Sequence, residues 1–214
     1  MHGLINKAIQ SYLGNTFGPA MWDDVSRHAR LDQSLGPDGF EAMQTYDDQL
    51  TEAVLASAAQ LTNRPRAALL EDLGTYLVSH PTQLRLRRLL RFGGISFTDF
   101  LHSLEDLPGR TRLAVPEMTL PEFVTHETAP GRFHLTFRNC PPGFGYVMLG
   151  ALRALADDYG ALTVAEHQDA TAPGGHEQDV PTDADSDHES LLIEVHDPAF
   201  HAGRRFDLAD MASA

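Results

Sequence analysis

The sequence contains very little cysteine and tryptophan, with one residue of each among its 214. A lone cysteine, Cys140, excludes an intramolecular disulfide framework and fits a reducing compartment. No apolar run approaches the roughly 20 residues that a membrane-spanning helix needs, and residues 1–10 lack the basic, apolar and small-residue zones of a signal peptide. We therefore expect a cytoplasmic protein without a membrane partner.

Basic residues are also scarce, since 16 Lys and Arg stand against 30 Asp and Glu, giving a formal net charge of −14. This balance argues against a nucleic-acid partner. The chain has no G-x-S-x-G nucleophile motif, no glycine-rich phosphate loop and no metalloprotease helix. We expect a non-enzymatic protein, and the length of 214 residues with 42% hydrophobic content predicts a single domain over residues 1–214.

Apolar residues recur at helical spacing through the first part of the chain. The pattern predicts helices over 4–13, 19–29, 46–61 and 63–77, with Gly14 and Asn15 ending the first helix and Asn63 capping the last. The run from Leu31 to Glu41 is rich in Gly, Pro and Asp and predicts a loop. Residues 1–62 are therefore expected to form an N-terminal helical part.

Beyond Pro121 the hydrophobic period changes to that of strands. Alternating apolar residues predict strands over 133–137, 162–166 and 191–195, and residues 144–159 predict a helix that ends at Gly160. We expect an α+β fold, with the helical part packed on an antiparallel sheet with helices over 63–200. Residues 166–190 are acidic and predict a flexible loop.

The most informative stretch runs from Gly94 to Phe123. Ser96 is placed to cap a helix, with Asp99 three residues later as the acid of a capping box. Apolar side chains then form one continuous helical face: Phe97, Phe100, Leu101, Leu104 and Leu107. Pro108 is expected to end this helix, followed by Gly109 as its C-terminal residue.

This stretch resembles the haem–nitric oxide/oxygen-binding (H-NOX) family, in which F-L-x-x-L-[DE]-x-L is followed after a gap by P-x-F. The matching residues are Phe100, Leu101, Leu104, Glu105, Leu107, Pro121 and Phe123. The segments MHGLINKAIQSYL, LEDLGTYL and GFGYVMLGALRALADDYG also resemble the family's opening helix, acid–x–x–Gly helix and C-terminal helix. The resemblance covers Met1 to Val195.

The resemblance implies an H-NOX-like fold, a haem cofactor and a sensory role that a signalling partner reads, such as a diguanylate cyclase or a histidine kinase. Two motifs depart from it. Pro108 occupies the position of the histidine that ligates haem iron, and a proline has no lone pair for a metal. Phe137, Asn139 and Pro141 occupy the positions of the Y-x-S-x-R motif that clasps the haem propionates. We therefore predict that ordinary histidine-ligated haem is absent.

By resemblance, an apolar slot would be lined by six residues: Ile5, Leu104, Leu107, Pro108, Pro121 and Phe137. These side chains either pack as ordinary core or line a retained ligand cavity. The first case predicts a ligand-free protein-interaction module, and the second a sensor of porphyrin or another flat apolar molecule. His102 is not expected to bind iron, because six residues at about 100° each turn it roughly 120° from the direction of Pro108.

Two charged segments have competing interpretations. Arg85, Arg87, Arg88 and Arg91 form a basic helix face, which is either a solvated surface or a docking surface for a signalling partner. Asp183, Asp185, Asp187 and Glu194 have the spacing of an EF-hand calcium loop. His188 stands at the glycine position of that loop and its flanks read as strands, so we favour a solvated loop over a metal site.

Overall fold

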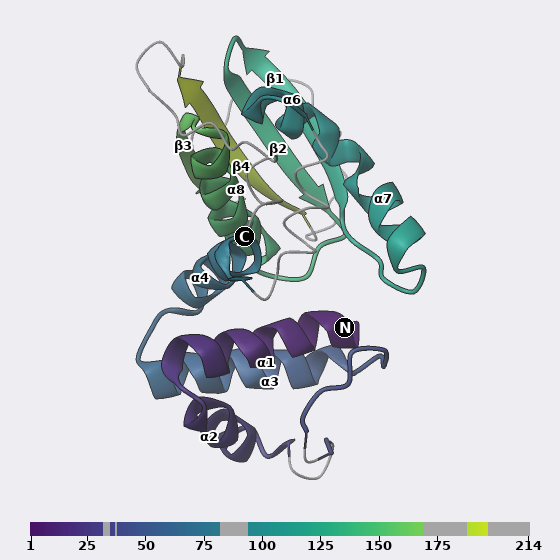
Figure 1. Ribbon diagram of the computed structural model, residues 1–214, viewed down its shortest axis with the longest axis vertical. Helices are drawn as coiled ribbons and strands as arrows, with labels where there is room; N and C mark the ends of the chain where they lie inside the picture. The colour runs from purple at the N-terminus through teal and green to yellow at the C-terminus, as the bar shows by residue number, and fades with distance from the viewer. Residues whose placement is uncertain (32–34, 37, 82–93, 169–187, 197–214) are drawn as a thin grey trace, which may run out of the picture.

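The computed structural model describes residues 1–31, 35–36, 38–81, 94–168 and 188–196. The first part of the protein is built from helices (Figure 1). The helices are α1 (Gly3–Phe17), α2 (Ala20–His28), α3 (Asp48–Thr62) and α4 (Arg66–Ser79). The carboxylate of Asp47 caps α3 by accepting a hydrogen bond from the amide of Gln49 at 2.9 Å. Residues 1–62 thus contain α1, α2 and α3, and α4 lies beyond them.

The second part combines helices with an antiparallel sheet. Its elements in chain order are α6 (Phe97–His102), the 3₁₀ turn η3 (Ser103–Asp106), α7 (Leu107–Ala114), β1 (Glu122–Ala129), β2 (Arg132–Arg138), α8 (Phe144–Tyr159), β3 (Leu162–Gln168) and β4 (His188–His196). The strand order is β1-β2-β4-β3, and each neighbouring pair is antiparallel. The predicted α+β class is confirmed.

The buried side chains form two clusters. One lies among α1–α4, and the other joins α6, η3, α7 and α8 to the inward face of the sheet. Helix α4 contributes to both, because Leu73 and Tyr76 belong to the first cluster and Val78 to the second. In Figure 1, α4 accordingly lies between the lower group of helices and the sheet.

Helices α4 and α8 touch through two glycines. A Cβ at Gly74 would lie 1.9 Å from the carbonyl oxygen of Val147, and one at Gly150 would lie 1.9 Å from that of Glu71. Only hydrogen fits at either position, so the two backbones approach directly. The side chain of Glu71 also forms an ion pair with Arg153 of α8. This contact explains the glycine in the segment LEDLGTYL.

The expectation that Pro108 ends a helix is wrong. Helix α6 ends at His102, and η3 links it to α7, which begins at Leu107 with Pro108 in its first turn. A proline at this position loses nothing, because the first amides of a helix have no intrahelical acceptor. Gly109 is accordingly an interior residue of α7 and not a C-terminal one.

Other elements also differ from the expectations. Strand β3 extends to Gln168 and β4 begins at His188, so strand residues occupy both ends of the loop expected over 166–190. Helix α1 continues through Gly14 to Phe17. Asn63 ends α3 in the left-handed conformation, with φ of 52°, and does not begin α4, which follows Pro65. Strand β1 was not predicted, because only Phe123 of its side chains is fully buried and the alternation is weak.

We predict that Gly74→Ala and Gly150→Ala each lower the free energy of unfolding by about 1–3 kcal/mol, because the added methyl group forces α4 and α8 apart. Gly14→Ala is the matched control, since no atom lies within 4 Å of its added Cβ. That change removes backbone entropy from the unfolded chain and is expected to stabilise α1 by about 0.5–1 kcal/mol. Urea denaturation followed by circular dichroism measures all three, and equal effects would contradict the close contact.

A second prediction concerns the capping box of α6. Ser96 Oγ accepts from the amide of Asp99 at 3.1 Å, and the Asp99 carboxylate accepts from the amide of Ser96 at 3.0 Å. These hydrogen bonds to Ser96 hold the pKa of Asp99 below its ordinary value. The stabilisation is therefore present above the ordinary pKa and is lost as the pH falls through the lowered one.

Ser96→Ala is expected to raise the pKa of Asp99 toward its ordinary value, as measured by carboxyl-carbon NMR titration. Ser103→Ala, at the other end of α6, is the control and should leave that titration unchanged. An unaltered Asp99 titration in Ser96→Ala would show that the cap does not form in solution.

Candidate functional site

The six slot residues lie in two places. Leu104, Leu107 and Phe137 belong to the buried cluster that joins the α6–α7 segment to the sheet. Pro121 is buried just before β1, and Pro108 is half-buried in the first turn of α7. Ile5, on α1, is half-buried and packs against the other cluster.

Phe137 is enclosed by aromatic rings. Its ring centroid lies 5.3 Å from that of Phe123 and 5.3 Å from that of Phe144, both in edge-to-face geometry. The side chain is fully buried. Phe137, which the resemblance assigns to the position of the family's tyrosine hydroxyl, is therefore a phenyl ring within a closed apolar contact.

The other two clasp positions carry no cation. Asn139 is exposed and left-handed, with φ of 55°, and Pro141 is exposed. Arg66 of α4 approaches this segment, and its Nη2 donates to the carbonyl oxygen of Pro142 at 3.0 Å. The same nitrogen donates to both carboxylate oxygens of Glu52 at 2.8 and 3.0 Å, so its charge is already paired.

A carboxylate lies next to these positions instead. Glu189 of β4 is the cross-strand neighbour of Phe137. Its oxygens accept hydrogen bonds from the amides of Gly143 at 2.5 Å and Gly145 at 2.7 Å, which begin α8. A helix N-terminus attracts anions through its amides and its dipole. The glutamate therefore occupies an anion site that this fold builds from its own backbone.

His167 of β3 completes this arrangement, which we call the α8 cap (Gly143, Gly145, His167, Glu189). Its Nε2 lies 3.1 Å from Glu189 Oε2, and its ring stacks on Tyr146 with a centroid distance of 4.1 Å. A Cβ at Gly145 would lie 2.6 Å from the His167 ring. Sequence reasoning missed the cap, although two glycines at the start of a helix were a signal for close backbone approach.

His102 lies away from the slot. Its side chain is 50% exposed, its Nε2 lies 3.5 Å from the carboxylate of Glu127, and its ring contacts Phe133 edge-on. The turn of about 120° between His102 and Pro108 assumed one continuous α-helix, which the 3₁₀ turn η3 interrupts. That His102 does not bind iron stays a prediction.

The charged segments lie largely outside the described residues. This applies to Arg85, Arg87, Arg88 and Arg91, and to Asp183, Asp185 and Asp187. Glu194 lies on β4, where it forms an ion pair with Arg132 at 2.9 Å. Within the described ranges, no group of three or more His, Cys, Asp or Glu side chains is arranged to hold a metal ion. In the same ranges, no helix is both long and apolar enough to cross a bilayer.

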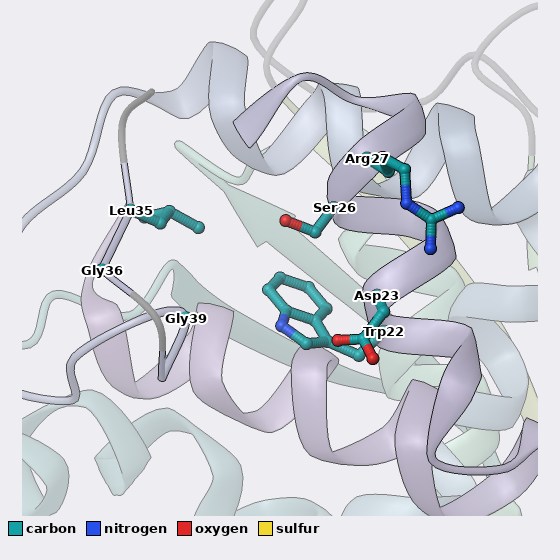
Figure 2. A pocket seen from close by; sticks show the side chains of 7 residues that line it. All are labelled: Trp22, Asp23, Ser26, Arg27, Leu35, Gly36 and Gly39. Carbon is teal, nitrogen blue, oxygen red and sulfur yellow. The ribbon is translucent and has the colours of Figure 1, made fainter. Parts of the chain in front are cut away.

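One pocket of about 490 Å³ lies elsewhere, beside α2. Figure 2 shows its lining: Trp22, Asp23, Ser26, Arg27, Leu35, Gly36 and Gly39. The indole of Trp22 also contacts Phe40, with ring centroids 5.7 Å apart. None of the six slot residues lines this pocket, so it is not the slot that the resemblance predicts.

The model of the Haem-NO-binding family matches residues 2–167 of this chain. The chain belongs to this family. Soluble guanylate cyclase gcy-31 of Caenorhabditis elegans is 24% identical over 159 residues, which are 74% of this chain and 22% of that protein. Soluble guanylate cyclase 89Db of Drosophila melanogaster is 19% identical over 167 residues, 78% of this chain and 24% of that protein. The chain thus spans about a quarter of the length of these relatives.

Solved H-NOX structures share its fold. An H-NOX protein from S. oneidensis in the Fe(II)NO state superposes with a TM-score of 0.67 at 17% identity, covering 92% of this chain and 100% of that one. The Fe(II) unliganded H-NOX protein from K. algicida gives a TM-score of 0.69 at 15% identity, covering 92% and 97%. Identities this low establish the H-NOX fold alone.

The residues of this chain do not fit a haem held in the family's manner. By the resemblance, the position of the iron ligand holds the saturated ring of Pro108, and the clasp positions hold a buried phenyl ring, an exposed amide and a second proline. The neighbouring Glu189 carboxylate would repel propionates rather than bind them. Arg66, which approaches this segment from α4, is paired with Glu52.

We predict that Glu189→Ala lowers the free energy of unfolding by about 2–4 kcal/mol, because two amides and an imidazole lose a charged acceptor that is largely buried. Glu189→Gln keeps one acceptor oxygen and is expected to cost about half as much. Glu166→Gln, an exposed position on β3, is the control and should change stability by less than about 0.5 kcal/mol. Equal melting temperatures for all three variants would show that Glu189 does not cap α8.

Proposed function

We propose that this protein is a sensory or regulatory H-NOX domain of signal transduction that no longer senses gas through histidine-ligated haem. The observation that carries the proposal is Pro108, half-buried in the first turn of α7 at the position of the family's iron ligand. A prolyl nitrogen within a peptide bond has neither a lone pair for a metal nor a proton to lose. No step of gas sensing through an iron–imidazole bond is available to this residue.

The clasp positions support the same conclusion independently. Arg-to-carboxylate hydrogen bonds contribute about 1.5–3 kcal/mol each, and this chain places Pro141 where such an arginine would be. The carboxylate of Glu189 lies beside Phe137 on the adjacent strand. A propionate would therefore lose an attraction and meet a repulsion in the same place.

Between the two roles left by the sequence, the packing favours a ligand-free interaction module. Leu104, Leu107 and Phe137 are at most 5% exposed and lie in one continuous apolar cluster. Side chains packed in this way occupy space that a flat apolar ligand would need. A sensor of a porphyrin or bilin remains the alternative that the experiment below distinguishes.

The catalytic activity that this domain regulates is proposed to lie in a partner protein or in another part of a longer chain. The curated relatives are soluble guanylate cyclases, of which this chain matches only about a quarter. By resemblance, the partner is a cytoplasmic diguanylate cyclase or histidine kinase, and the domain itself catalyses no reaction. Its role is to change the activity of that partner on binding.

After expression with added haem precursor, the purified protein should show no sharp, nitric-oxide-responsive Soret band, because no imidazole lies at the Pro108 position. The H-NOX protein from S. oneidensis, prepared in parallel, is the positive control. Melting temperatures with haem, protoporphyrin IX and biliverdin form the second readout, and none should rise by more than about 1 °C.

A nitric-oxide-responsive Soret band in the purified protein would contradict the proposal. If such a band appeared, His102→Ala would show whether the histidine of α6 supplies the ligand. A saturable melting shift with porphyrin or biliverdin, without an iron–imidazole spectrum, would replace the ligand-free module by the sensor of an apolar ligand.

The regulatory role is tested by mixing the purified domain with a purified diguanylate cyclase or histidine kinase. The partner enzyme's rate of product formation should change at least twofold when the domain is saturating. Nitric oxide should not alter this rate. A partner activity that is unaffected at saturation would contradict regulation of that enzyme.

A further inference from the structure

The sheet has a second face, opposite to the core. Along β2, Phe133, Leu135 and Phe137 face the buried cluster, so the residues between them, His134 and Thr136, point to the other side. The described helices α6, α7 and α8 contribute to the same cluster and therefore pack on the core face. We call the opposite face, to which His134 and Thr136 point, the outer face.

Two histidines meet on this outer face. His126 of β1 and His134 of β2 are directly paired across the antiparallel strands. Directly opposed residues have Cβ atoms about 4.5–5.5 Å apart, so their rings rise from the sheet side by side. His126 is exposed and His134 is half-buried. The short turn at Pro130 and Gly131 joins the two strands and fixes this register.

Neither ring is used by the fold. Other histidines of the protein have polar side-chain partners: His28 contacts Ser57 at 3.0 Å, and His102 and His167 contact glutamates. Among the described residues, no hydrogen bond or ion pair is recorded for His126 or His134. Their ring nitrogens therefore remain available to an external ligand.

The surroundings tolerate an added cation. On the outer face, His134 is flanked across β4 by Leu192, and the next cross-strand pair is Arg132 with Glu194. The positive charge of Arg132 is matched by Glu194 at 2.9 Å. Two imidazoles on adjacent positions of a rigid hairpin are a suitable donor set for zinc or nickel, with nitrogen–metal bonds of about 2.0–2.1 Å for zinc.

We propose that His126 and His134 form a two-histidine binding site for a divalent transition-metal ion, with water completing the coordination. The site lies on the face of the sheet opposite to the slot, so it is separate from the haem chemistry of the family. It is also separate from the residues with EF-hand-like spacing, Asp183 to Glu194, because it uses nitrogen ligands on β1 and β2. A bound ion would link β1 to β2 and stabilise the hairpin.

The test uses the full chain without an affinity tag, and calorimetric titration with Zn²⁺ and with Ni²⁺ at pH 7.5. His126→Gln and His134→Gln should each weaken binding at least tenfold, since one imidazole alone is a poor ligand for these ions. His102→Gln is the matched control, because His102 belongs to α6 and contacts Phe133 on the core face of the sheet. Circular dichroism establishes that each variant is folded.

A second measurement does not depend on the variants. Substoichiometric Ni²⁺ should broaden the imidazole proton resonances of His126 and His134 before those of the nine others among the 11 histidines of the chain. Ni²⁺ should also raise the melting temperature of the wild type but not of the double variant. Binding that is equally strong in His126→Gln/His134→Gln, or broadening that begins at other histidines, would overturn the proposal.

Discussion

The direct contact between α4 and α8 is the constraint on which the arrangement of this domain depends. Helix α4 belongs to the packing of the N-terminal helices, and α8 lies against the sheet. Gly74 and Gly150 let the two backbones touch, so the contact between α4 and α8 sets how the helical part lies relative to the sheet. The ion pair between Glu71 and Arg153 lies at the same crossing. A bulkier residue at either glycine would separate the two cores that the slot residues span.

Much of this architecture could be predicted from the sequence, because helix periodicity is a local property. The predicted bounds of α8, 144–159, are those observed, because Gly143 and Gly160 flank it and both adopt left-handed conformations. Strand β1 escaped prediction because it is an edge strand with mostly exposed side chains. Pro108 was misjudged because a proline is tolerated at the beginning of a helix as readily as it ends one.

The candidate site was less predictable than the fold, for a physical reason. The resemblance assigns Pro108 and Phe137 to the slot by their positions in motifs. Glu189 could not be recognised in this way, because its importance depends on a contact between residues 44 and 46 positions apart in the chain. The pairing of His126 with His134 likewise depends on the hairpin register, which the sequence pattern left open when β1 was not recognised. Long-range pairings determine both sites, and hydrophobic periodicity does not report them.

The α8 cap has a consequence for the alignment of the sheet. Side chains alternate along β4, so a slip by one residue would turn Glu189 outward and present His188 or Ser190 to the amides of α8. The carboxylate would lose both amide donors, and those amides would lose their acceptor. A single buried charge therefore selects one alignment of β4 between β2 and β3 and rejects its neighbours. In this domain the amides that begin α8 determine which alignment β4 adopts in the sheet.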